Sequence, residues 1–247
     1  MLHGLRGTHQ GLQAIADILT QNAYHTITPD LPGSGDSAPL ENQTLHGYVE
    51  WLHGFIQAQQ LPEKPVLIGH SMGSVIVSHH ALQYPDDAGR ELILMSPVFR
   101  SPAEQEFSTL LNNGMDTLIH ILPENIRTDL LNSKAVSYGV SRYLTADRSQ
   151  QKRIDRLHAE YSGHFASADS FLSDARIAQC AQAVIPEGKD VLLIMGKKDR
   201  LISAKFVQEV ADMTHTKLVL IPNAGHLINY EQPAKAAHAI MEFLSVE

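Results

Sequence analysis

The pentapeptide Gly69-His70-Ser71-Met72-Gly73 marks a point where the chain has to change structure within one residue. Residues 65–70 form a short apolar run, as expected of a strand covered on both faces. Residues 72–84 have the pattern of a helix, which Pro85 ends. A turn this tight between a strand and a helix leaves room only for small residues on either side of its central serine. Gly69 and Gly73 meet that requirement, so we expect a strand–turn–helix unit centred on Ser71.

The same turn suits Ser71 to nucleophilic chemistry. It places the serine at the N-terminus of a helix, where the partial positive charge of the helix favours a developing alkoxide. The backbone N–H of Met72 faces the same place and could hold an oxyanion. The alternative is an ordinary strand-to-helix turn that happens to contain a serine, and the buried strand and helix on either side argue against it.

Strands and helices alternate through the first part of the chain. Residues 9–22 and 44–60 have helical patterns, whereas 24–31 and 91–97 read as strands. This rhythm predicts a mostly parallel sheet sandwiched between helices, an α/β fold.

The rhythm stops at residue 98 and returns at about residue 187. The segment between contains helical stretches over 109–122 and 149–161 and no convincing strand. Beyond it we expect strands at 190–195 and 216–221, a helix at 203–213, and a closing helix that begins at Pro233. We therefore divide the chain into a core of residues 1–97 and 187–247 and a helical cap of residues 98–186 that folds over Ser71.

A serine hydroxyl needs a general base, and the base needs an acid that orients it. Asp199 follows the carboxyl end of the strand 190–195, at the edge of the sheet where ligands bind. Asp190 precedes that strand, and no carboxylate follows the strand 91–97. His226 follows the strand 216–221, so the order serine, acid, histidine is that of the nucleophile-elbow enzymes. Other histidines precede a strand or lie within helices: His215, His238, His79 and His80.

Four motifs give the chain a resemblance to the α/β-hydrolase superfamily, above all to esterases, lipases and carbon–carbon bond hydrolases with helical caps. Gly-His-Ser-Met-Gly-Ser resembles its nucleophile elbow, His3-Gly4 resembles the pair that ends its third strand, and Gly225-His226 resembles the loop of its base. Residues 30–37 (DLPGSGDS) resemble a further loop of the family. The resemblance covers nearly the whole chain. It implies that Leu5 supplies the second oxyanion N–H and that the helical insertion is a cap.

One feature departs from that family. The chain starts almost at His3-Gly4, whereas family members begin with two strands and most of a third. The third strand lies between the strands that we place at 24–31 and 65–70. A gap there would leave buried backbone groups unpaired, at about 1–3 kcal/mol each. We therefore expect that roughly 20–30 native N-terminal residues, with their strands, are missing; a partner chain or a repaired sheet are the alternatives.

Composition excludes several other functions. The formal net charge of −8, without clustered Lys and Arg, argues against a nucleic-acid surface. The single cysteine, Cys180, cannot form an intrachain disulfide, and neither a secretory leader nor an apolar stretch of membrane-spanning length is visible, which favours a cytoplasmic location. No metal-ligand motif such as H-E-x-x-H is present, so we expect neither a metal nor a cofactor.

The combined reading is a serine hydrolase that acts on small or medium carboxylic esters. A β-diketone hydrolase with the same triad and a non-catalytic ligand-binding protein remain alternatives. The cap helices carry apolar residues and little charge, which favours uncharged esters; examples are Leu110, Leu111, Leu118, Ile119 and Ile121. A preference for charged substrates would instead indicate Arg6 or Arg142 as an anion clamp.

Overall fold

Four parallel strands form the centre of the molecule. The computed structural model describes residues 1–119, 121–161 and 167–245. Its sheet has the order β1-β2-β3-β4, which is also the order along the chain. The strands are β1 (Leu67–His70), β2 (Glu91–Met95), β3 (Asp190–Gly196) and β4 (Lys217–Ile221). Each pairs in parallel with its neighbour, which confirms the predicted fold class.

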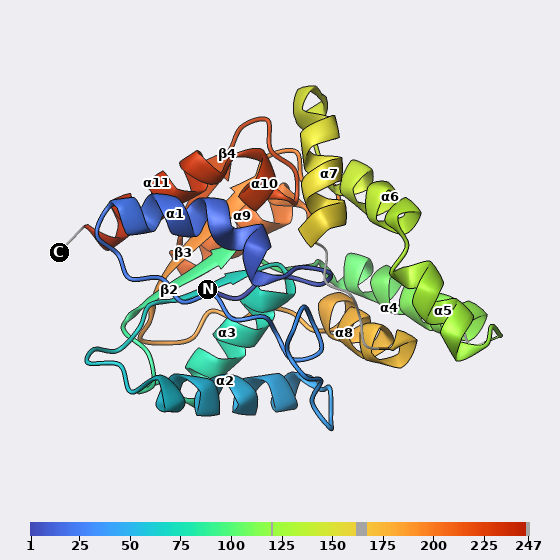
Figure 1. The fold of residues 1–247 in the computed structure, drawn as a ribbon. Coiled ribbons are helices and arrows are strands. Elements are labelled where there is room, and N and C mark those ends of the chain that lie inside the picture. Colours follow the sequence, from blue (N-terminus) through green and yellow to red (C-terminus); the bar gives the residue numbers. More distant parts are fainter. Residues whose placement is uncertain (120, 162–166, 246–247) are drawn as a thin grey trace.

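Helices cover both faces of the sheet (Figure 1). One face packs against α1 (Gln13–Gln21) and α11 (Pro233–Leu244). The other face packs against α2 (Leu45–Gln59), α3 (Met72–Gln83) and α9 (Ala204–Thr214). Alternate residues of each strand face opposite layers. Ile93 and Met95 therefore pack with α1 and α11, whereas Leu92 and Leu94 pack on the face of α2, α3 and α9.

Between β2 and β3, the described residues form helices and connecting loops and no strand. These helices lie together beside the sheet, on the right in Figure 1. They are α4 (Pro102–Ile119), α5 (Glu124–Leu131), α6 (Lys134–Leu144), α7 (Gln151–Tyr161) and α8 (Ala168–Cys180). Three short helices complete the described elements: η1 (His9–Leu12), η2 (Arg148–Gln150) and α10 (Ile228–Glu231). Over the described residues, no helix has the length and apolar character that crossing a membrane requires.

The strand predicted at 24–31 does not form, because the segment has no strand beside it to complete a hydrogen-bond ladder. The only pairing on that side of β1 is an isolated parallel bridge between Leu2 and Gly69, as far as the described residues go. In it, Leu2 N donates to Ile68 O at 2.8 Å, and His70 N donates to Leu2 O at 2.9 Å. Met1 N donates to Ile27 O at 2.6 Å.

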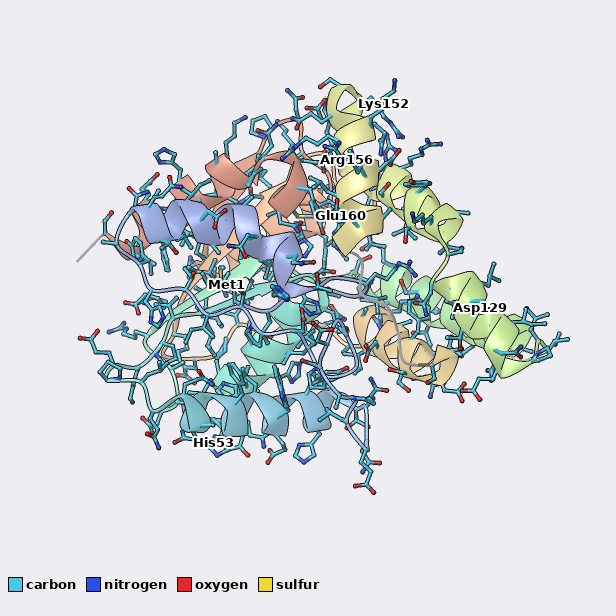
Figure 2. The ribbon with its side chains drawn as sticks, in the orientation of Figure 1. Met1, His53, Asp129, Lys152, Arg156 and Glu160 are labelled. Carbon is cyan, nitrogen blue, oxygen red and sulfur yellow. The ribbon has the colours of Figure 1, made fainter. Side chains whose placement is uncertain are left out.

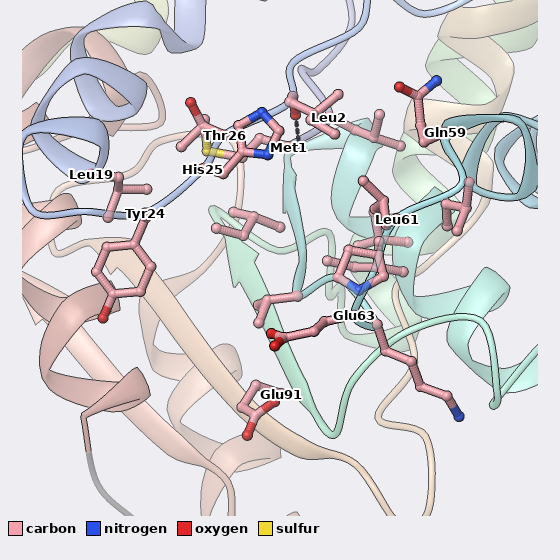
Figure 3. A pocket seen from close by; sticks show the side chains of 18 of the residues that line it. Met1, Leu2, Leu19, Tyr24, His25, Thr26, Gln59, Leu61, Glu63 and Glu91 are labelled. Atoms are coloured by element: carbon pink, nitrogen blue, oxygen red, sulfur yellow. Dashed lines mark hydrogen bonds between the residues drawn. The ribbon is translucent and has the colours of Figure 1, made fainter.

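A cavity of about 510 Å³ lies between residues 24–29 and residues 65–68. Figure 3 shows side chains around it, among them those of Met1, Leu2, Tyr24 and Leu61, and residues 65–68 line it as well. The missing third strand of the family is expected at this place, between residues 24–31 and 65–70. Its presence in the native protein stays a prediction. The lining residues include none of Ser71, Asp199 and His226, so the cavity is separate from the predicted site.

A buried hydrogen bond joins α8 to the core. Tyr48 on α2 has its hydroxyl 2.7 Å from Asp174 Oδ1 on α8 and 3.0 Å from the carbonyl oxygen of Pro32. Asp174 is buried, and its burial raises the pKa of the carboxyl to about 7. A protonated Asp174 can donate to Tyr48, which then donates to Pro32, so each polar hydrogen has an acceptor.

Asp174→Asn is expected to remove one component of the pH dependence of stability. Because its pKa is about 7 in the folded protein against an ordinary value of 3.8, the folded state holds a proton that the unfolded chain releases. Asp174 therefore stabilises the fold at low pH, and its contribution falls as pH rises toward 7, by at most about 1.4 kcal/mol per pH unit.

Urea unfolding at intervals from pH 4.5 to 8 measures this difference. The free energy of unfolding of the wild type should fall relative to that of Asp174→Asn as pH rises. The control is Asp169→Asn, which changes a carboxylate of the same helix that is 60% exposed and paired with Arg127. Parallel pH profiles for wild type and Asp174→Asn would contradict the assignment.

Candidate active site

Ser71 lies at the junction of β1 and α3. Its backbone takes the left-handed value φ +53°, which is strained for a residue with a side chain. Its N–H still continues the ladder of the sheet by donating to Met95 O at 2.9 Å. A Cβ on Gly73 would come within 2.6 Å of Leu2 O and 2.7 Å of His3 O. The close approach of these segments therefore requires glycine, as the sequence motif predicts.

The loop of residues 3–5 lies directly against Ser71. A Cβ on Gly4 would be 2.8 Å from Ser71 Cβ. His3 fixes this loop: its Nε2 accepts from Leu31 N at 2.9 Å, and its Nδ1 donates to Gly4 O at 2.9 Å. Burial lowers the pKa of His3 to about 4, so the ring is neutral and can both donate and accept. The loop that carries the Leu5 N–H is thus held beside the serine, and Met72 begins α3 immediately after it.

The structure brings Ser71, His226 and Asp199 together in one hydrogen-bonded chain. His226 Nε2 is 2.8 Å from Ser71 Oγ, and His226 Nδ1 is 2.8 Å from Asp199 Oδ2. Since a carboxylate only accepts, Nδ1 carries the proton and Nε2 accepts from the serine hydroxyl. The loops after β3 and β4 meet here, because Lys198 N donates to Ala224 O at 2.9 Å.

The carboxylate of Asp199 is held in its charged form. Its side chain is fully buried, which alone would raise its pKa, but His226 and two backbone N–H groups outweigh burial and lower it. Those groups are the N–H of Leu201 at 2.8 Å and of Ile202 at 3.0 Å, both donating to Oδ1. Asp190 lies at the opposite end of β3 and pairs with Arg90 at 2.9 Å.

The backbone of His226 is also fixed. Its carbonyl oxygen accepts from His70 Nε2 at 3.0 Å and from the Ser96 hydroxyl at 2.9 Å. Burial, followed by the nearby His226, lowers the pKa of His70 to about 3, so His70 is a neutral donor. The histidine of the elbow motif therefore links the loop of Ser71 to the loop of His226.

Comparisons with known proteins agree with this geometry. The model of a family described as the alpha/beta hydrolase family matches residues 1–239. The chain belongs to the alpha/beta hydrolase family.

Among individual relatives, a monoacylglycerol lipase of Rattus norvegicus is 23% identical over 261 residues, covering 99% of this chain and 74% of that protein. Lipase 1 of Psychrobacter immobilis is 26% identical over 255 residues, covering 100% of this chain and 76% of that protein. An esterase of Exiguobacterium antarcticum has a similar fold, with a TM-score of 0.74 at 18% identity, over 98% of this chain and 90% of its own. These proteins resemble the chain over nearly its whole length and agree with its place in the hydrolase family.

Glu231 was not predicted from the sequence. It holds the backbone just before His226 in place. The buried carboxylate accepts from Gly225 N at 2.7 Å and from Ala146 N and Asp147 N, both at 2.9 Å. Burial raises the pKa of Glu231, while these N–H groups act in the opposite direction. No sequence motif marks Glu231, because its partners lie some 85 residues away at the end of α6 as well as next to His226.

The helical segment reaches the site at two further points. Leu144 O at the end of α6 accepts from His226 N at 2.9 Å. The buried Arg6, one residue after Leu5, donates to Leu131 O at 2.7 Å and to Ser137 Oγ at 2.8 Å. Arg142, the other predicted anion clamp, is 63% exposed and pairs with Asp155 at 3.2 Å.

Proposed function

We propose that this hydrolase is a serine esterase that cleaves small or medium carboxylic esters through an acyl-enzyme. Ser71 is the nucleophile, His226 the general base and Asp199 the acid that orients the histidine. The observation that carries the proposal is the pair of 2.8 Å hydrogen bonds from Asp199 through His226 to Ser71. Relatives that are named lipases support ester substrates.

The reaction follows from the directions of these bonds. His226 Nε2 takes the proton of Ser71 as its oxygen attacks the ester carbonyl. The N–H groups of Leu5 and Met72 stabilise the oxyanion. Protonated His226, held by Asp199, then gives its proton to the departing alcohol, and water activated by the same histidine releases the acid.

Ser71→Ala tests the nucleophile. Without the hydroxyl no acyl-enzyme forms, so hydrolysis of p-nitrophenyl esters should fall by about 10³-fold or more, with unchanged thermal unfolding. A fluorophosphonate probe should label the wild type and leave the variant unlabelled. Retention of activity within about tenfold would contradict the role of Ser71. A folded wild type that neither turns over esters nor takes the probe would indicate a ligand-binding protein.

Asp199→Asn tests the orienting acid. The amide removes the charge that stabilises protonated His226 and disfavours the tautomer that accepts from Ser71, so kcat should fall roughly 10²- to 10⁴-fold. The matched control is Asp190→Asn at the other end of β3, where the carboxylate pairs with the exposed Arg90. Steady-state kinetics of both variants on one ester decide the matter: a larger loss in Asp190→Asn would refute the assignment.

Residues 98–186 form, in this proposal, the cap that sets the substrate. The bonds from Leu131, Ser137 and Leu144 to the loops of Leu5 and His226 support this role. Leu110 and Ile121 do not pack inward: their exposed fractions are 69% and 75%. Exposed apolar side chains of this kind on the proposed cap favour an apolar ester over a charged one. The side chains of Leu111, Leu118 and Ile119 lie outside the described part of the structure.

Neutral esters with short-to-medium acyl chains should therefore be better substrates than charged ones. An unpaired carboxylate would lose its hydration on entering an apolar pocket, which lowers kcat/KM. Matched neutral esters and dicarboxylate monoesters of equal chain length test this directly. A higher kcat/KM for the charged member would refute the apolar pocket and implicate Arg6 or Arg142 as an anion clamp, which Arg6→Met and Arg142→Met would distinguish.

A further inference from the structure

Three potential metal ligands converge between α2, α3 and the turn that follows α3. His53 belongs to α2, His80 to α3, and Asp87 to the turn that follows α3. One ligand atom from each lies within 4.8 Å of the other two. Figure 2 labels His53 on α2, in the helical layer under the sheet. His80 is nine residues along α3 from Ser71, which corresponds to roughly 13 Å of helix.

Both histidines direct a ring nitrogen at the same carboxylate oxygen. His53 Nδ1 is 2.6 Å and His80 Nε2 is 3.0 Å from Asp87 Oδ2. Each ring therefore donates a proton toward one point in the apo protein. A metal ion near that point would replace both protons and gain two nitrogen ligands and one oxygen ligand.

The surroundings hold the three side chains in place. The ring of His53 stacks on Tyr84 with a centroid distance of 4.0 Å and an angle of 11°. The second oxygen of Asp87 accepts from Gln57 Nε2 at 3.0 Å, the kind of outer contact that orients a ligating carboxylate. Asp87 N also donates to Tyr84 O at 3.2 Å. The ligands are thus oriented before any ion binds.

Burial and access are suited to an ion that enters from solvent. The side chain of His80 is fully buried and that of Asp87 is 10% exposed, whereas that of His53 is 36% exposed. Among the described residues, His80 Nδ1 has no hydrogen-bond partner. With Nε2 on a metal this nitrogen would carry the ring proton, and with Nε2 protonated it carries a lone pair.

The charged groups near the three ligands are of both signs: the carboxylates of Asp87 and Glu50 and the ammonium of Lys189. The carboxylate of Glu50 lies in the same surface region, bonded to Tyr84 Oη at 2.5 Å. Lys189 opposes a cation electrostatically, but its Nζ is directed at three carbonyl oxygens of the turn, those of Pro85, Ala88 and Gly89, at 2.7, 3.2 and 2.8 Å. The ammonium therefore points at the backbone, and the carboxylate of Asp87 is the charge that meets the ion.

We propose that His53, His80 and Asp87 bind one Zn²⁺ ion, with water as the fourth ligand. Two imidazole nitrogens and a carboxylate form a donor set that zinc prefers. Tetrahedral zinc with bonds of about 2.0 Å places ligand atoms about 3.3 Å apart. The existing separations of 2.6 and 3.0 Å then have to widen by about 0.7 and 0.3 Å. The ion would clamp α2 to α3 and to the turn 84–89, away from Ser71.

Zinc titration of the untagged chain after EDTA treatment and dialysis tests the site. Calorimetry should give one equivalent of tight binding, zinc should raise the Tm, and Co²⁺ should give the intense visible absorption of a tetrahedral site. His53→Ala and Asp87→Asn each remove a ligand and should weaken zinc binding by at least about tenfold. Neither residue contacts Ser71, Asp199 or His226, so these measurements are independent of ester hydrolysis.

Two controls decide where the ion binds. His46→Ala removes another histidine of α2, 73% exposed and 4.0 Å from Glu50, and should leave binding unchanged. His226→Ala removes another buried histidine–carboxylate pair, that with Asp199, and should also leave zinc binding unchanged. The proposal is overturned if zinc does not bind, if His53→Ala and Asp87→Asn bind as the wild type does, or if His46→Ala or His226→Ala abolishes binding.

Discussion

The turn at Ser71 constrains the rest of the molecule, because two backbone segments, residues 2–4 and 71–73, pass closer there than side chains would allow. Gly73 lies against the carbonyl oxygens of Leu2 and His3, and Gly4 lies against the Cβ of Ser71. Ser71 has a strained, positive φ. The hydrogen bond from its N–H to Met95 O, which continues the parallel ladder, helps to hold that conformation. The histidine that accepts from this serine comes from another part of the chain, and the order of the sheet brings it there.

That arrangement also depends on close approach. β3 and β4 are neighbours, so the loops at their carboxyl ends meet, and a Cβ on Gly196 would come within 2.5 Å of Ala224 O. The missing side chain lets the loop of Asp199 reach that of His226. Parallel topology and the close approaches at Gly4, Gly73 and Gly196 thus bring Ser71, His226 and Asp199 together. The hydrogen bonds among the three side chains add little net stability by comparison.

Much of this could be predicted from the sequence, because strands, glycines and the order of Ser71, Asp199 and His226 are local signals. The segment 24–31 was predicted wrongly as a strand, since its β-rich composition says nothing about whether a neighbour is present to pair with it. Glu231 and the cluster of His53, His80 and Asp87 could not be found, because each depends on residues that are distant in sequence. A histidine in a helix looks the same in sequence whether it packs, donates or binds an ion.

His226 is hydrogen-bonded to the helical segment as well as to the core. His226 N donates to Leu144 O of α6, while Glu231 joins Gly225 to Ala146 and Asp147 at the end of the same helix. A shift of α6 would therefore move the backbone of His226, and with it the ring that is hydrogen-bonded to Ser71. If substrate binds against these helices, as proposed, the same helices hold the substrate and position His226. Substitutions in the helical segment should therefore alter kcat as well as KM.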